Sequence, residues 1–141
     1  MSARSDIAET VKAMLEAGIP EVQGRVYRTR LLPTDPRHWP CLLVVLDREQ
    51  VDTKGGIPGR RVQSRELTLS VFFVDSALRE DLEDHLEAFN DRIEAVFASD
   101  WLLRNGGLPK VSDLRIASTV ATISPQGSQA VGVLRKDFRL E

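Results

Sequence analysis

The chain is poor in the residues that build cross-links and metal sites, with one cysteine, Cys41, and two histidines, His38 and His85, in 141 residues. A single cysteine cannot form a disulfide within the chain, and these three side chains are one short of the four ligands of a structural zinc site. Cys41 also opens an apolar run, so we expect a buried thiol and no nucleophile there. The scarcity of these residues predicts a fold that is stabilised by packing.

Long hydrophobic runs are also missing. The densest run, residues 41–46, is far shorter than the about 20 residues of a membrane-spanning helix. The N-terminal stretch has no apolar region of the length that a signal peptide needs. These features predict a protein that folds in the cytoplasm and makes no membrane contact.

The overall composition is that of an ordinary globular domain, with 42% hydrophobic residues, 28% charged residues and a net charge of −2. We therefore expect one domain over residues 1–141 and no general coating of nucleic acid. The glycines and arginines at 55–61 lack the spacing of a Walker phosphate loop. No residue pattern predicts a catalytic, metal-binding or cofactor-binding site, and the chain is not expected to be an enzyme.

Hydrophobic spacing predicts an α+β fold. A helix is expected over 6–17 with Ser5 as its N-cap, and a second over 76–99 with an apolar stripe from Leu78 to Phe97. Strands are expected at 24–28, 41–46, 64–74, 111–123 and 129–140. The element order α-β-β-β-α-β-β predicts a mostly antiparallel sheet of about five strands with two helices packed on it.

Two predicted strands are joined by a long connection over residues 47–63. Glycine and proline are concentrated at 55–59, which disfavours regular structure at that point. We therefore expect a long hairpin loop, and loops of this length are usually functional or disordered.

In the predicted strand 111–123, Leu114, Ile116 and Val120 are expected on one face.

Charge is distributed unevenly along the chain. Residues 75–100 hold nine acidic and two basic residues, a net charge of −7, so the rest of the chain carries +5. Opposite patches on one chain allow head-to-tail contact between copies, although a solvated acidic face is the simpler alternative. The candidate interface residues are Glu80, Glu83, Asp84, Glu87, Asp91 and Glu94 on the acidic side, and Arg48, Lys54, Arg60, Arg61 and Arg65 on the basic side.

Several short sequence segments form a recognisable pattern when they are taken together. They are AGIP at 17–20, GRVYRTR at 24–30, LLP at 31–33, WPCLLV at 39–44, RELTLSV at 65–71 and QAVGVLRKDF at 129–138. In this pattern the chain resembles, over nearly its whole length, the tail terminator proteins of long-tailed phages, of the lambda minor tail protein U type, which are often encoded in prophages. The resemblance carries no short motif by which individual functional residues can be transferred.

The resemblance implies a structural role without catalysis. Such proteins form a hexameric ring on the head-proximal end of the tail tube, stop its polymerisation and offer a surface for joining the head. The expected partners are further copies of the chain, the tail-tube protein and a head-completion protein. The chain itself can be monomeric in solution. The expected location is the host cytoplasm during assembly and then the virion tail, with DNA contact inside the ring as a secondary interaction at most.

Three alternatives stay open at the level of sequence. The first is a head–tail connector or tail-completion protein of the same particle, which has a similar size and make-up. The second is a small enzymatic or ligand-binding domain, which needs a concave pocket with convergent polar groups. The third is DNA binding through Arg60 and Arg61, which predicts a steep salt dependence of affinity.

Overall fold

A computed structural model describes residues 3–29, 36–55, 61–78, 80–126 and 129–141. The elements follow the predicted order, which confirms the α+β class. The helices are α1 (Ala3–Gly18) and α2 (Leu82–Ser99), with short 3-10 turns η1 (Pro20–Val22) and η2 (Pro36–His38). The strands are β1 (Val26–Tyr27), β2 (Cys41–Gly55), β3 (Arg61–Leu78), β4 (Leu114–Gln126) and β5 (Gln129–Leu140). In this part of the chain no helix is both long and apolar enough to cross a membrane.

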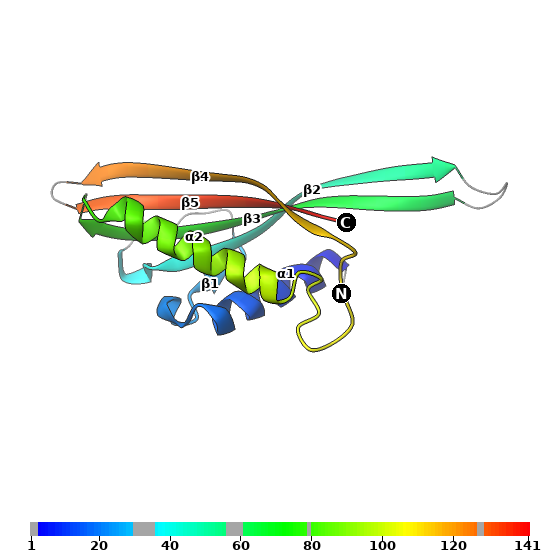
Figure 1. Cartoon of the computed structure of the whole chain (residues 1–141), viewed down its shortest axis with the longest axis horizontal. Coiled ribbons are helices and arrows are strands. Elements are labelled where there is room, and N and C mark those ends of the chain that lie inside the picture. The colour runs from blue at the N-terminus through cyan, green and yellow to red at the C-terminus, as the bar shows by residue number, and fades with distance from the viewer. Residues whose placement is uncertain (1–2, 30–35, 56–60, 79, 127–128) are drawn as a thin grey trace.

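The strands form one mixed, mostly antiparallel sheet in the order β1-β2-β3-β5-β4. The two-residue β1 runs parallel to β2, and the other neighbouring strands are antiparallel. Both helices lie over the same face of this sheet (Figure 1). Among the described strands β4 has only β5 as a neighbour, so it forms one edge of the sheet.

The core lies between the helices and the sheet. The predicted stripe of α2 is buried at Leu82, Leu86, Phe89, Ile93 and Phe97. The ring of Phe89 stacks on Phe73 of β3 with 4.2 Å between centroids, and Phe97 packs against Phe138 of β5 at 4.3 Å. The predicted inward residues of α1 and β3 are also buried, namely Ile7, Val11, Met14, Leu15, Leu67, Leu69, Val71 and Phe73.

The predicted loop over 47–63 is wrong for most of its length. β2 continues to Gly55 and β3 begins at Arg61, with paired residues from Glu49↔Leu67 to Gly55↔Arg61. β5 pairs with β3 only from Leu67 onward, so this outer part is a ribbon of two strands. The sequence of this ribbon lacks the apolar alternation by which a strand is usually found. We call residues 50–55 and 61–66 the arm; it projects beyond the body of the fold (Figure 1).

Two expectations about the helix starts are corrected. Ser76 to Leu78 belong to β3, because they pair with Val131 to Gln129 of β5, and α2 starts only at Leu82. Ser5 lies inside α1, which starts at Ala3, so it is not the N-cap.

The predicted common face of Leu114, Ile116 and Val120 is wrong as well. The register shifts between Ile116 and Ser118, so Ile116 is paired with the core residue Phe138 and Val120 with the exposed Arg135. A β-bulge of this kind moves the following side chains to the opposite face.

Gly132 of β5 lies against the side chains of Leu82 and Leu86 of α2. A Cβ atom at this position would lie 2.8 Å from Cδ1 of Leu86 and 3.1 Å from Cδ1 of Leu82. We predict that Gly132→Ala lowers the free energy of unfolding by about 1–2 kcal/mol through overpacking, measured by urea denaturation. The control is Gly107→Ala, which meets only the backbone oxygen of Arg104 at 3.5 Å and is expected to have little effect. Equal stabilities of the two variants would contradict the close packing.

Candidate assembly surface

The acidic face of α2 is solvent-exposed because the opposite stripe is buried on the sheet. Glu83, Asp84, Glu87 and Asp91 are all exposed. Glu80 is exposed too, but it lies in the turn before α2 and not on the helix. Five of the six predicted acidic candidates therefore remain available to a partner.

Glu94, the sixth acidic candidate, is already paired within the chain. The Nζ of Lys136 in β5 donates to Glu94 Oε1 at 2.5 Å, to Asn90 Oδ1 at 2.9 Å and to Thr119 Oγ1 at 2.8 Å. Lys136 is fully buried, and its ammonium group has three hydrogens for these three acceptors. This Lys136 bridge connects α2, β4 and β5.

Sequence reasoning did not single out Lys136. Its signal is its position between Leu134 and Phe138, two inward-facing core residues of β5. By strand alternation a lysine at that position also points to the core, where a charged group needs partners. The partners come from elements distant in sequence, so only the structure shows them.

A groove of about 360 Å³ runs between α2 and β4. Its helix side is acidic, with Glu83, Asp84 and Glu87, and its strand side carries Thr119, Ala121 and Ile123. Asn90 and Thr119 line it as well, so the Lys136 bridge lies beside the groove. The arrangement joins a negatively charged wall to an open strand edge.

The next residue of β5, Asp137, holds β4 on the opposite face of the sheet. Its carboxylate accepts hydrogen bonds from Ser70 Oγ of β3 at 2.7 Å, Ser118 Oγ of β4 at 3.1 Å and Arg135 Nε at 3.1 Å. Burial raises the pKa of Asp137, but the hydrogen bonds from Ser70, Arg135 and Ser118 outweigh it and hold the pKa below its usual value. Ser118 and Thr119 are thus fixed from both faces.

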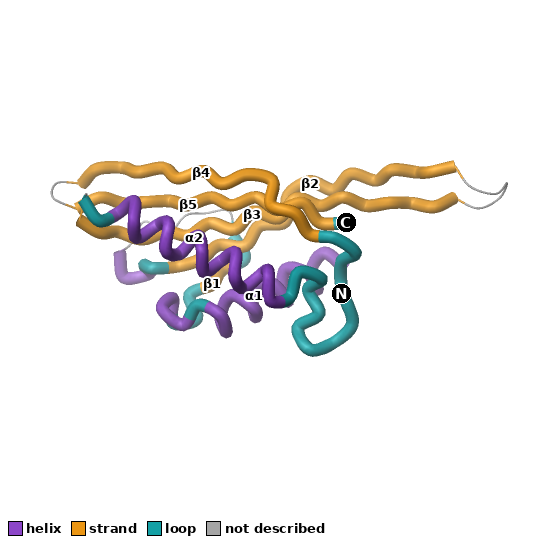
Figure 2. Tube along the Cα trace, in the orientation of Figure 1, coloured by secondary structure: helices purple, strands orange, loops and turns teal. Residues whose placement is uncertain are grey.

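Three of the five basic candidates, Lys54, Arg61 and Arg65, lie on the arm, and Arg48 lies just before it. Arg48 and Lys54 belong to β2, and Arg61 and Arg65 to β3, whereas Arg60 lies outside the described residues. Figure 2 shows the arm leaving the body at the end of the sheet opposite to the β4–β5 turn, and the first turns of α2 lie toward that turn. The basic arm and the acidic end of α2 therefore do not meet within one chain.

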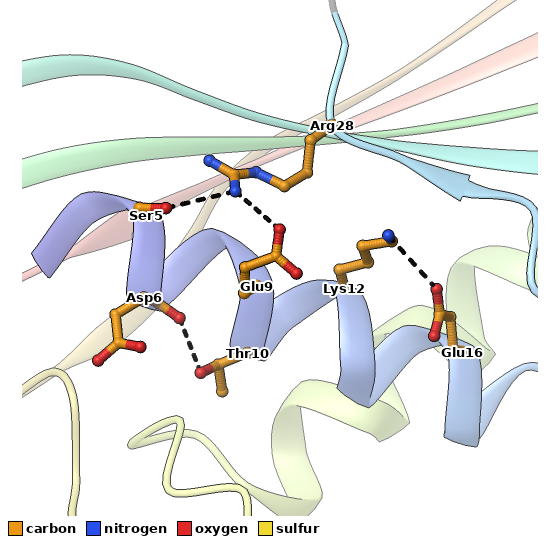
Figure 3. A network of polar contacts seen from close by, with 7 residues as sticks. All are labelled: Ser5, Asp6, Glu9, Thr10, Lys12, Glu16 and Arg28. Atoms are coloured by element: carbon orange, nitrogen blue, oxygen red, sulfur yellow. Dashed lines mark hydrogen bonds and ion pairs between the residues drawn. The ribbon is translucent and has the colours of Figure 1, made fainter. Parts of the chain in front are cut away.

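Arginines before β2 have partners within the chain instead. Arg28 contacts Glu9 Oε1 at 2.7 Å and Ser5 Oγ at 3.4 Å on α1, as Figure 3 shows. The hydrogen bond from Arg28 holds the pKa of Glu9 below its usual value. Arg25 donates from Nε to the Pro40 carbonyl at 3.0 Å. These arginines position α1 and the entry to β2.

The three candidate reactive side chains, Cys41, His38 and His85, show no features of a catalytic site in the described structure. Burial raises the pKa of the Cys41 thiol to about 11, and His38 is exposed. His85 is a boundary side chain as predicted, with Nε2 2.6 Å from Asp75 Oδ2 and its ring against Phe73 and Phe89. Within the described ranges, no three histidine, cysteine or acidic side chains come together as metal ligands.

Comparison with known proteins gives structural likenesses only. No family model matches the chain, and no curated protein matches it. Among solved structures, a chain of a native gene transfer agent virion is 18% identical, with 93% of this chain and 91% of that chain covered and a TM-score of 0.44. A second solved chain, whose description names no function, is 13% identical with 94% of both chains covered and a TM-score of 0.43. At TM-scores below 0.5 these likenesses carry no functional conclusion.

The Lys136 bridge predicts unequal roles for two glutamates about two turns apart on α2. Glu94→Ala leaves the buried ammonium without its counter-charge and is expected to lower the free energy of unfolding by about 2–4 kcal/mol. The matched control Glu87→Ala removes an exposed carboxylate and is expected to change it by less than about 0.5 kcal/mol. Denaturation curves of both variants test this, and equal effects would contradict the bridge.

Asp137 predicts a pH-dependent stability difference. Because its pKa is lower in the folded state, its carboxylate stabilises the fold above the unfolded-state pKa, and this is lost as pH falls through the folded-state value. The wild type is therefore expected to be more stable than Asp137→Asn at pH 6, with a gap that narrows below about pH 4. Thermal melts from pH 6 to pH 3 measure the gap, and a constant difference would contradict the assignment.

Proposed function

We propose that this chain is a structural protein of a phage or prophage particle that caps the tail tube as a ring. In this role it ends tube polymerisation and provides the head-joining surface, without catalysing a reaction. The proposal is supported by the sequence resemblance to tail terminators over nearly the whole chain. It is supported independently by the placement of opposite charges at opposite ends of the sheet, and this second observation carries the mode of assembly.

The charge placement favours contact between copies. An acidic helix face and a basic arm that cannot meet within one chain can meet between neighbouring chains in a head-to-tail arrangement. Such a contact is heterologous, and a heterologous contact that closes on itself makes a ring. We propose that the acidic face contributes Glu83, Asp84 and Glu87, with Glu80 and Asp91 beside them, and that the basic side contributes Arg48, Lys54, Arg60, Arg61 and Arg65.

The partners follow from this role. Copies of the chain form the ring, which is a hexamer in the assembled particle. In solution the chain is monomeric or assembled, depending on conditions. The tail-tube protein binds one side of the ring and a head-completion protein the other. The ring forms in the host cytoplasm and ends at the head-proximal end of the tail.

Charge reversal on α2 tests the contact between copies. We predict that Glu83→Lys combined with Glu87→Lys abolishes concentration-dependent association in sedimentation velocity at low salt, because like charges then face the arm. The control, Asp6→Lys combined with Glu16→Lys at an exposed and a half-buried position of α1, makes the same change in net charge and should associate like the wild type. Association of both variants at wild-type strength would contradict the acidic face as the contact.

Tube growth tests the functional role itself. Added to polymerising tail-tube protein, the chain is expected to stop elongation at substoichiometric amounts, seen as a fixed tube length in electron micrographs. If elongation continues and the chain instead binds a portal assembly, the alternative of a head–tail connector or tail-completion protein is supported and the capping role is contradicted.

A further inference from the structure

The β4 edge of the sheet is open along its length. β4 pairs with β5 from Leu114↔Leu140 to Gln126↔Gln129, and no described strand lies on its other side. In Figure 2 it runs along the outer margin of the body. An edge strand presents backbone N–H and C=O groups that can pair with another chain.

β4 has a bulge at Ile116/Ser118 and is flanked by Arg115 and Pro125, but the stretch between these residues lacks the charged and proline residues that usually protect an edge. Soluble proteins place lysine, other charges or proline on exposed edge strands. From Ile116 to Ser124 the sequence IASTVATIS contains no charged residue and no proline, and five of its nine residues are β-branched. Ile116, Val120 and Ile123 are 52%, 54% and 40% exposed. The composition and the exposure are those of a strand that accepts a partner.

The arm has the complementary properties. Among the described residues its two strands pair only with each other over Gln50–Gly55 and Arg61–Glu66, and an isolated two-stranded ribbon is marginally stable in water. A third strand against it supplies further backbone hydrogen bonds. The described arm carries three basic residues, Lys54, Arg61 and Arg65, against two acidic ones, Asp52 and Glu66, a net charge of +1. The wall beside the β4 edge carries three acidic residues, Glu83, Asp84 and Glu87.

We propose that the β4 edge accepts the arm of a second copy of this chain by β-strand addition, so that the sheet continues from one subunit into the next. This inference rests on the self-association proposed above and assigns its main-chain contact. Backbone pairing supplies affinity, and the acidic wall of α2 selects the basic arm over other strands.

Side-chain hydrogen bonds on both faces of the sheet fix the β4 edge in place. Ser118 and Thr119, which follow the bulge in β4, are bound by Asp137 on one face and Lys136 on the other. A strand that is already fixed loses little conformational freedom on binding, which favours association. The arm of the same chain points away from this edge, so a second copy is the occupant (Figure 1).

Lysines on the edge test the proposal. Thr122→Lys combined with Ser124→Lys adds two charges at exposed β4 positions that pair with Val133 and Val131, so the fold should be retained. Repulsion of the arm is expected to weaken association about tenfold in sedimentation. The control, Ala98→Lys combined with Leu108→Lys at exposed positions off the edge, should associate like the wild type. Circular dichroism of each monomer verifies folding.

Hydrogen exchange locates the contact without a mutation. On association of the wild-type chain, amides of residues 116–124 and of residues 61–66 are expected to become protected together. Association with no added protection in β4, or unweakened association of the edge variant, overturns strand addition but leaves the ring proposal standing. A wild-type chain that stays monomeric at every salt and protein concentration overturns both.

Discussion

The packing of α2 against β4 and β5 depends on the Lys136 bridge. Its buried ammonium meets one acceptor from β4 and two from α2, and each hydrogen has a partner. A buried charge without such partners is strongly destabilising, so α2 and β4 have little freedom to separate around it. Asp137, the next residue, ties β4 to β3 and β5 on the other face. One dipeptide of β5 thus fixes the edge strand that borders the acidic groove.

A fixed acidic groove at one end and a basic arm at the other give the chain two unlike ends. The arm is the part of the described fold with the least support, because only two strands form it. The edge strand that borders the groove is held by Lys136 and Asp137 and is paired with a described strand on one side only. Two copies in head-to-tail contact supply what each lacks, namely a third strand for the arm and a countercharge for α2. The structural role proposed for the chain follows from this complementarity together with the sequence resemblance.

Sequence alone predicts the parts of the fold that depend on local periodicity. The stripe from Leu82 to Phe97 and the alternation in β3 identify α2 and its sheet partner because burial imposes those spacings. The arm is missed because its sequence shows no apolar period. The bulge at Ile116/Ser118 and the partners of Lys136 are missed for a different reason, since both depend on pairings between elements far apart in the chain. The acidic candidates were found by charge, but only three-dimensional packing separates Glu94, which is committed to Lys136, from the exposed Glu83 and Glu87.

The central claim is that this chain works by closing into a ring with copies of itself. Negative-stain electron microscopy of the purified protein, class-averaged without imposed symmetry, tests this most directly. The account predicts closed rings with six-fold symmetry in which neighbouring subunits follow one another head to tail. Two-fold dimers that join like surfaces, or a monomer at all concentrations, would contradict it.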